Sequence, residues 1–423
     1  MFEEGPDPLH DNTVYDWNLV EPTVRFRRKH VELLDETLRD GLQSAYLVNP
    51  PVEEKAELLR LMDALGIETA DIGLPGASDT ATAECIHLAK AIRDEGLRIR
   101  PAVAVRTLED DVANAARVSQ AAGMPLEVMA FIGSSPIRMI AEEWDLPLML
   151  GRARMAIQFA RREGLPVTFV TEDTIRSRPD ILYRLIENAI DAGATRLCLT
   201  DTVGHATPDG IRSLLRFVWN LLKGMGARVG VDWHGHNDRG IALSNSLWAL
   251  QWGADRVHGC ALGVGERSGN CSIDRLIMNL RLLGTIGEDR DVSHLLDYCH
   301  CASRILKYPI PPNYPLAGSD AFRTQTGVHA AAILKARRKG DSYLADRIYS
   351  GVPAGMFGRT QEVCIGPMSG ASNVVQYLAD RGIDPTPQQV AAVLSRAKSG
   401  NHILSDSEVM EALGPAAPQA PDA

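Results

Sequence analysis

Two histidines separated by one glycine, His234 and His236 in the stretch VDWHGHND, have the residue type and spacing of a metal site. In an extended strand, side chains at positions i and i+2 project from the same side. At a strand end, both rings could bind one divalent ion while each ring's other nitrogen contacts a further acceptor. The alternative is that two polar residues share the solvated face of a strand end. The surrounding residues must decide between these interpretations.

The elements that would position these histidines repeat along the chain. From near residue 31, short runs of β-branched and aliphatic residues alternate with longer segments of helical periodicity. Eight strands alternating with helices in about 260 residues are typical of a (β/α)8 TIM barrel. An open doubly wound sheet would normally have a glycine-rich phosphate turn where this chain has DETLRDGLQ. We predict strands at residues 30–37, 67–76, 98–106, 126–133, 166–173, 195–202, 228–236 and 255–265.

The composition along the chain suggests four regions. We predict an N-terminal extension over residues 1–29 and the TIM-barrel catalytic domain over residues 30–290. A proline-rich linker, KYPIPPNYPLAG, leads into a smaller and mostly helical C-terminal subdomain over residues 291–405. The Pro- and Ala-rich end of the chain predicts a disordered tail over residues 406–423.

Polar residues stand at the end of most of the predicted strands. In a TIM barrel the active site is built from the C-terminal ends of the strands and the loops that follow them. Each such residue has an ordinary explanation, for example as a helix cap, but their convergence on one rim indicates a site. They are Arg39, Asp40, Gln43, Asp71, Ser134, Ser135, Glu172, Asp173, Asp201, Thr202, His234, His236, Asn237, Asp238, Glu266, Arg267 and Asn270.

One subset of these residues has the chemistry of metal ligands. Asp40, His234 and His236 provide a carboxylate and two imidazoles, and Asn270 can add a carbonyl oxygen. A set without thiolates suits Mg, Mn or Zn in an open site. A 2-oxo acid could bind such an ion, which would polarise its ketone. Arg39 could then stabilise the developing alkoxide.

Composition and charge exclude several classes of partner. A net charge of -10 argues against nucleic acid, which is bound through clustered Lys and Arg. No apolar run approaches the length of a membrane span, and the acidic N-terminus has no apolar signal region, so we expect a cytoplasmic protein. Seven cysteines suit reduced thiols. The CHC sequence at residues 299–301 lacks a second ligand pair, which disfavours a structural zinc there.

Five motifs resemble, in the same order, the signatures of the 2-isopropylmalate synthase and homocitrate synthase family. They are DETLRDGLQ, DTVGHATP, HGHNDRGIALSNSLWAL, GVGERSGN and FRTQTGVHAAA, within residues 30–375. The resemblance implies a metal-dependent TIM barrel that is related to the carbon-carbon lyases for hydroxymethylglutaryl-CoA. It also implies condensation of an acyl-CoA, usually acetyl-CoA, with a 2-oxo acid, followed by hydrolysis of the thioester.

The resemblance also implies roles for individual residues. Asp40, His234 and His236 would bind the metal with Asn270 beside it, and Arg39 would be catalytic. The remaining residues would act on the substrates. Glu172 and His329 are the candidates for the enolising base and for activating the water, Thr202 would hold the 2-oxo acid carboxylate, and Gln43, Asp71, Ser135, Arg138, His205 and Glu266 complete the substrate-binding set.

Two of the implied residues lie in the C-terminal region. His329 in TGVHA matches a histidine that family members commonly supply from a neighbouring subunit, and Tyr349 in RIYSGVP matches a tyrosine that enters the same site. By itself, His329 would be interpreted as a residue of a helix surface. The resemblance therefore implies a homodimer that acts on two small-molecule substrates.

Three positions depart from the family pattern and affect the predicted substrate. Arg138 stands where many isopropylmalate synthases have the histidine of Ser-Pro-Ile-His. Homocitrate synthases have an arginine nearby that pairs with the distal carboxylate of 2-oxoglutarate, so a charged acceptor is one interpretation; the other is that Arg138 faces solvent. His205 and Met368 also replace the residues usual at their positions, which puts a standard substrate in doubt.

Two other functions compete with a synthase. The lyase branch has a cysteine in a glycine-rich loop after the eighth strand, whereas Cys271 here lies one residue past the predicted ligand Asn270. A non-catalytic protein that kept the fold would be free to lose its site residues. The set that argues against this is Arg39, Asp40, Glu172, His234, His236 and His329, all of which are present.

Overall fold

The computed structural model describes residues 14, 15, 17–19, 31–286 and 290–414. These residues divide into two compact units. The barrel unit contains the described residues up to Tyr46 and those from Gly66 to the gap at 287–289. The C-terminal unit contains Leu47–Leu65 and the described residues from Arg290 on. Most of the predicted N-terminal extension, residues 1–29, lies outside the described residues.

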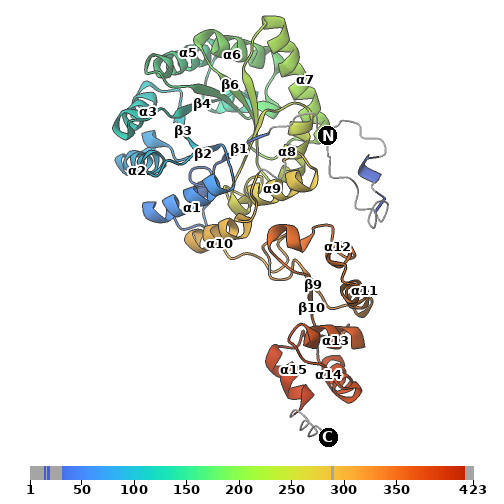
Figure 1. Ribbon diagram of the computed structural model, residues 1–423. Helices are drawn as coiled ribbons and strands as arrows, with labels where there is room; N and C mark the ends of the chain where they lie inside the picture. The colour runs from blue at the N-terminus through green and yellow to red at the C-terminus, as the bar shows by residue number, and fades with distance from the viewer. Residues whose placement is uncertain (1–13, 16, 20–30, 287–289, 415–423) are drawn as a thin grey trace. The chain divides into compact units, whose positions relative to one another are not determined.

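Eight parallel strands form a closed barrel in the order β1 to β8, which confirms the predicted fold class (Figure 1). Each strand pairs with the next along the chain, and β8 closes on β1, where Leu34 lies opposite His258. Strands such as β4 are buried along most of their length, as expected for a parallel sheet covered by helices. The strands are β1 (Glu32–Asp35), β2 (Thr69–Asp71), β3 (Arg100–Arg106), β4 (Glu127–Gly133), β5 (Val167–Glu172), β6 (Arg196–Asp201), β7 (Gly230–Gly235) and β8 (Arg256–Gly259).

Helices alternate with these strands and surround the barrel (Figure 1). Local sequence signals explain their bounds, as in α7, where the Thr207 hydroxyl caps the first turn and Gly226 ends the helix in a left-handed conformation. Its buried residues recur at helical spacing, so one apolar face packs inward. The helices of this unit are α2 (Asp79–Glu95), α3 (Glu109–Ala122), α4 (Pro136–Ala141), α5 (Leu146–Arg162), α6 (Pro179–Ala192), α7 (Pro208–Met225), α8 (Ala242–Gln251) and α9 (Ile273–Leu282).

The C-terminal unit is mostly helical, as predicted, and has its own apolar core. Ile365, Val374, Leu378 and Val393 lie at the centre of this core. A two-stranded parallel sheet joins Arg323 to Glu362. The elements are α1 (Val52–Ala64), α10 (Leu295–Leu306), β9 (Arg323–Thr324), α11 (Gly327–Arg338), α12 (Ser342–Arg347), β10 (Glu362–Val363), α13 (Ala371–Ala379), α14 (Pro387–Ser399) and α15 (Asp406–Leu413).

The predicted disordered tail begins too early. Residues 406–413 form α15, because Ser405 and Glu408 make a reciprocal capping box and Val409 is buried in the C-terminal core. Residues 415–423 lie outside the described residues. In the part of the chain that is described, no helix combines the length and the apolar character that a bilayer span requires.

Candidate active site

A cavity of about 260 Å³ lies at the C-terminal ends of the barrel strands. Its wall toward the barrel interior is apolar and includes Ala104, Met129 and Val170, two of which belong to the apolar cluster inside the barrel. The other side of the lining is polar. It brings together the predicted residues Arg39, Asp40, Gln43, Glu172, Thr202, His234, His236 and Glu266.

The predicted metal ligands converge at this cavity. Asp40, His234 and His236 offer ligand atoms that all lie within 4.8 Å of one another, and all three are buried. His236 Nε2 lies 3.6 Å from Asp40 Oδ2. An isolated antiparallel bridge holds Asn270 beside His236, and the Asn270 amide donates a 2.7 Å hydrogen bond to Asp40.

The donor atoms of this group fit a divalent cation. His236 Nδ1 and Asn270 Oδ1 are buried, and neither has a hydrogen-bond partner among the described residues. Burial lowers the pKa of His236 to about 4, so its imidazole is neutral at neutral pH. Burial alone would raise the pKa of Asp40, but the Arg39 guanidinium beside it, followed by His234, holds it below its usual value. His236 and Asp40 are therefore in the forms that bind metals.

Arg39 is fixed by three carboxylates. Its Nε lies 2.7 Å from Asp71 Oδ2, its Nη1 lies 2.6 Å from Asp40 Oδ1, and its Nη2 lies 2.9 Å from Glu36 Oε1. Asp71, predicted to bind substrate, instead contacts Arg39, and burial raises its pKa to about 6 despite the nearby guanidinium. The guanidinium therefore has a defined position beside Asp40, His234 and His236, the three candidate ligands that we call the metal group.

Glu172, at the end of β5, faces Arg138 of α4. Arg138 Nε lies 3.0 Å from Glu172 Oε1, and Arg138 Nη1 lies 3.1 Å from Glu142. Burial raises the pKa of Glu172 by more than the Arg138 charge lowers it. Glu172 is thus a partly buried carboxylate with increased basicity. Arg138 contacts this carboxylate but lies outside the lining of the cavity.

Three predicted substrate residues have different surroundings. Thr202 Oγ1 accepts a hydrogen bond from the Asp173 backbone amide and lies 3.0 Å from Thr200 Oγ1, with its side chain in the cavity lining. Ser135 is buried as the N-cap of α4. His205 is exposed, and its backbone amide donates to Asp201. Ser135 and His205 lie outside the lining of the cavity.

The structure brings the two predicted residues of the C-terminal unit together. His329, in α11, and Tyr349, after α12, stack with ring centroids 3.9 Å apart and an interplanar angle of 27°. Tyr349 is 45% exposed. The two side chains form a single aromatic and imidazole surface within their own unit.

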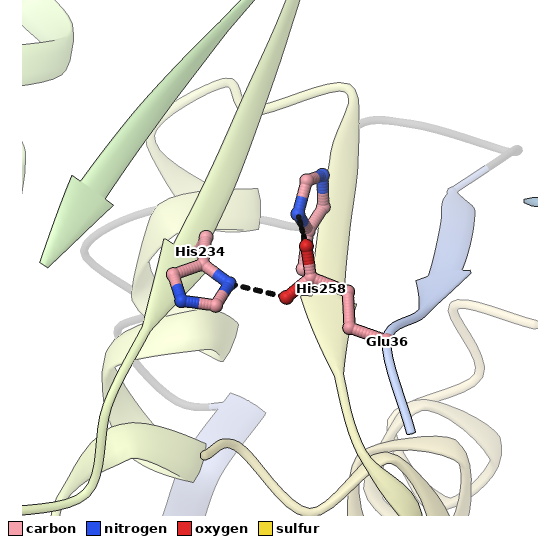
Figure 2. Close-up of side chains that lie close together, drawn as sticks. All are labelled: Glu36, His234 and His258. Atoms are coloured by element: carbon pink, nitrogen blue, oxygen red, sulfur yellow. Dashed lines mark hydrogen bonds and ion pairs between the residues drawn. The ribbon is translucent and has the colours of Figure 1, made fainter. Parts of the chain in front are cut away.

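Sequence reasoning missed a buried ionic network next to the metal group. Glu36 lies between the rings of His234 and His258, which come from β7 and β8 (Figure 2). Asp232 Oδ2 lies 3.3 Å from His258 Nε2 and 2.5 Å from the Arg256 guanidinium. A signal was available in the strands, because Asp232 and Arg256 precede histidines by two residues and so share their inward face.

The network consists of charged pairs. Burial alone would raise the pKa of Glu36, but His234, Arg39 and His258 hold it well below the usual value. Burial alone would lower the pKa of His258, but Cys198, Glu36 and other neighbours hold it well above the usual value. His258 is therefore an imidazolium beside the Glu36 carboxylate.

The fold and this cavity together define a TIM-barrel enzyme with a candidate divalent-metal centre. The family model described as HMGL-like matches residues 30–302, and the chain belongs to this family. A probable 2-isopropylmalate synthase of Methanopyrus kandleri is 31% identical over 87% of this chain and 69% of that protein. A homocitrate synthase of the same organism is 31% identical over 89% of this chain and 91% of that protein. These relatives confirm the family resemblance of the motifs.

The fold also has solved counterparts. The HMG-CoA lyase of Bacillus subtilis matches with a TM-score of 0.55 and 22% identity, over 67% of this chain and 96% of that one. This similarity concerns the fold of the barrel. A fold of this kind does not by itself determine the reaction, which depends on the residues of the cavity.

Proposed function

We propose that the protein condenses an acyl-CoA, with acetyl-CoA as the expected donor, with a 2-oxo acid and then hydrolyses the thioester. The observation that carries this proposal is the meeting, in one cavity, of the Asp40, His234 and His236 group with Arg39 and Glu172. The names of the relatives, 2-isopropylmalate synthase and homocitrate synthase, support it.

The 2-oxo acid would bind at the metal group. Asp40, His234 and His236 would hold a Mg, Mn or Zn ion with Asn270 beside it, and the bound ion would supply Lewis-acid polarisation of a ketone. Thr202 would donate a hydrogen bond to the carboxylate of the 2-oxo acid. The apolar wall of the cavity excludes water from one side of the acceptor and so strengthens these electrostatic contacts.

The reaction then follows from the positions of the acid and base groups. Glu172 would remove a proton from the acyl methyl group, because burial raises its pKa and makes it a stronger base than an ordinary glutamate. The resulting enolate carbon forms a bond to the ketone carbon, and the ketone oxygen becomes an alkoxide that Arg39 stabilises until it takes up a proton. Water then cleaves the thioester to give a carboxylate and the free thiol of CoA.

His329 and Tyr349 would be the contribution of the C-terminal unit to the active site. The pair would enter the barrel cavity of a second subunit in a homodimer, where His329 would activate the hydrolytic water. Their stacking supports a joint role, because two side chains distant in sequence are held as one surface. A symmetric dimer would give two such composite sites.

The lyase alternative has less support. Cys271, the cysteine nearest the predicted metal group in sequence, is fully buried, and burial raises its pKa to about 11. It lies outside the lining of the cavity. A thiol in this state is poorly suited to acid-base chemistry on a substrate.

The test of the proposed function is release of CoA thiol from acetyl-CoA in the presence of a divalent ion. The acceptors are 2-oxoisovalerate, 2-oxoglutarate, oxaloacetate, pyruvate and phenylpyruvate, with acetyl-CoA alone as the control. We expect acceptor-dependent release that a chelator abolishes. No release above the control with any acceptor would contradict the synthase proposal.

The position of Arg138 beside Glu172 favours a 2-oxo acid with a second carboxylate, which Arg138 would bind. Arg138→Gln should then lower kcat/KM for 2-oxoglutarate roughly tenfold or more relative to 2-oxoisovalerate, because a charge-assisted hydrogen bond is lost. The same change should shift the acid limb of the pH profile of kcat/KM to higher pH. Arg138 lowers the pKa of Glu172, and without it this base gains a proton at a higher pH.

Arg152→Gln is the matched control. Both guanidinium groups lie over the ring of Trp144, Arg138 at 6.0 Å and Arg152 at 5.4 Å from its centroid. Only Arg138 of these two forms an ion pair with Glu172. The control variant should keep the acid limb and the acceptor preference of the wild type. Equal shifts in the two variants would contradict the assignment of Arg138.

A further inference from the structure

The carboxylate of Glu36 is the meeting point of three side chains. Its Oε2 lies 2.6 Å from His234 Nδ1, and its Oε1 lies 2.9 Å from Arg39 Nη2 and 3.1 Å from His258 Nδ1. Figure 2 shows the carboxylate between the two imidazole rings. Glu36 is 1% exposed, so water does not substitute for these partners.

The contact with His234 determines which nitrogen can bind a metal. At 2.6 Å from a carboxylate oxygen, Nδ1 must carry a proton, because two lone pairs would repel each other at this distance. The lone pair of the neutral ring is then on Nε2. We infer that Glu36 is a positioning residue that fixes the orientation and tautomer of His234, and that His258 in turn holds Glu36 in place.

The interior of the barrel supports this arrangement from the side away from the cavity. His258 is buried, and its Nε2 contacts Asp232 at 3.3 Å. Arg256 and Arg196 both bind Asp232, at 2.5 Å and 2.7 Å, and Arg256 continues to Glu127 at 2.5 Å. The position of Glu36 is therefore determined by packed and ion-paired groups, which is what precise placement of a ligand requires.

Glu36 also connects the metal group to Arg39, and this distinguishes it from Asp71. Both carboxylates bind the guanidinium of Arg39, but Glu36 additionally contacts His234. Loss of the charge at position 36 should weaken metal binding, because Glu36 contacts the proposed ligand His234. Loss of the charge at Asp71 should change only the position of Arg39. This inference rests on the proposed function, in which His234 is a metal ligand.

The experiment measures Mn²⁺ binding to the metal-stripped full-length chain by calorimetry, with thermal unfolding followed in parallel. Glu36→Gln should weaken binding about 10- to 100-fold, as is typical when the partner of a ligating histidine is lost. Asp71→Asn, at a carboxylate that contacts Arg39 but not His234, should weaken Mn²⁺ binding much less than Glu36→Gln does. Asp111→Asn, which removes a buried carboxylate paired with Arg106 at 2.8 Å, is the control for loss of a buried charge elsewhere and should bind normally.

Two substitutions of His258 test the second step. Asparagine places its amide nitrogen near the position of Nδ1 and can still donate to Glu36, whereas glutamine places it near Nε2 and can reach only Asp232. His258→Asn should therefore retain much of the Mn²⁺ affinity, and His258→Gln should lose it about as far as Glu36→Gln does. In the double variant with Glu36→Gln, His258→Gln should add little further loss, because it acts through Glu36.

The outcomes separate this inference from the proposed function. If the wild type binds Mn²⁺ and folded Glu36→Gln binds it within twofold, the positioning role is wrong and the metal centre stands. If the wild type binds no Mn²⁺, the metal-dependent function fails and the inference fails with it. If Glu36→Gln does not fold, the two His258 variants provide the test. The inference is wrong if both His258→Asn and His258→Gln bind Mn²⁺ as tightly as the wild type.

Discussion

Replacing His234 with alanine is expected to abolish acceptor-dependent release of CoA thiol. The change removes one of the three proposed metal ligands, whose candidate donor atoms lie within 4.8 Å of one another. A metal contributes several kcal/mol of transition-state stabilisation, so kcat/KM should fall at least about a thousandfold. Thiol release and Mn²⁺ calorimetry on the same preparation measure the two effects together.

His294→Ala is the matched control for this change. His294 is an exposed histidine paired with Asp297 at 3.2 Å in the C-terminal unit, and its loss should leave both activity and Mn²⁺ affinity unchanged. Full turnover of a metal-stripped His234→Ala variant would contradict the metal centre.

The inactive His234→Ala variant also tests the proposed dimer. His329→Ala should be inactive for a different reason, since it changes the C-terminal unit and leaves the barrel ligands intact. If each site is built from two chains, an equimolar mixture after subunit exchange should regain about a quarter of the wild-type activity, because half of the dimers then contain one intact site. A mixture without activity, or a fully active monomer, would contradict a shared site.

Arg256→Met is expected to be the most destabilising single change in the barrel. The guanidinium is 0% exposed and contacts Asp232 and Glu127, each at 2.5 Å. Its loss leaves the buried Asp232 and the partly buried Glu127 without their common partner, and breaking a buried ion pair typically costs about 3–5 kcal/mol. The free energy of unfolding from urea titration measures this cost.

The pH dependence of this cost has a defined sign. Burial alone would raise the pKa of Asp232, but Arg256 and other cations hold it below its usual value. In the wild type this pair stabilises the folded state above the unfolded pKa of the carboxyl group, and the effect is lost as the pH falls through the folded pKa. The difference between wild type and Arg256→Met should therefore shrink on acidification. A difference that stays constant with pH would contradict the assignment to these carboxylates.

Arg100→Met is the control for Arg256→Met. Arg100 lies at the start of β3 and pairs with Glu32 at 3.3 Å, but its side chain is more than half exposed. An exposed ion pair contributes about 0–1 kcal/mol. Similar decreases in the free energy of unfolding in the two variants would show that the buried ion pairs contribute no more to stability than an exposed pair does.

The sequence was sufficient to predict the barrel and the meeting of Asp40, His234 and His236 at one end of it, for related physical reasons. Each strand leaves a local pattern of aliphatic and β-branched residues, and all eight observed strands fall within the predicted ranges. The C-terminal ends of barrel strands face one cavity by topology, so Asp40, His234 and His236 could be expected to meet. No pairing across the barrel had to be known for this step.

The residues that the sequence did not reveal depend on pairing across the barrel. Glu36 and His258 meet because β1 and β8 are adjacent in a register that sets Leu34 opposite His258. That register follows from closure of the whole sheet and is not encoded near either residue. By contrast, the helix α15 was not predicted, although the residues that encode it are neighbours in the sequence. The Ser405 and Glu408 capping box and the buried Val409 outweigh the Pro- and Ala-rich composition that follows.

The contact between Glu36 and His258 constrains how this chain can vary. Substitution of either residue alone removes one partner of a buried charged group inside the barrel, where Glu36 keeps Arg39 and His234 and His258 keeps Asp232. A single step of divergence at one position is therefore costly until the other position changes as well. Positions 36 and 258 should therefore covary among natural homologues. Homologues in which the two positions have exchanged their charged residues should be more frequent than homologues in which only one position has lost its charge.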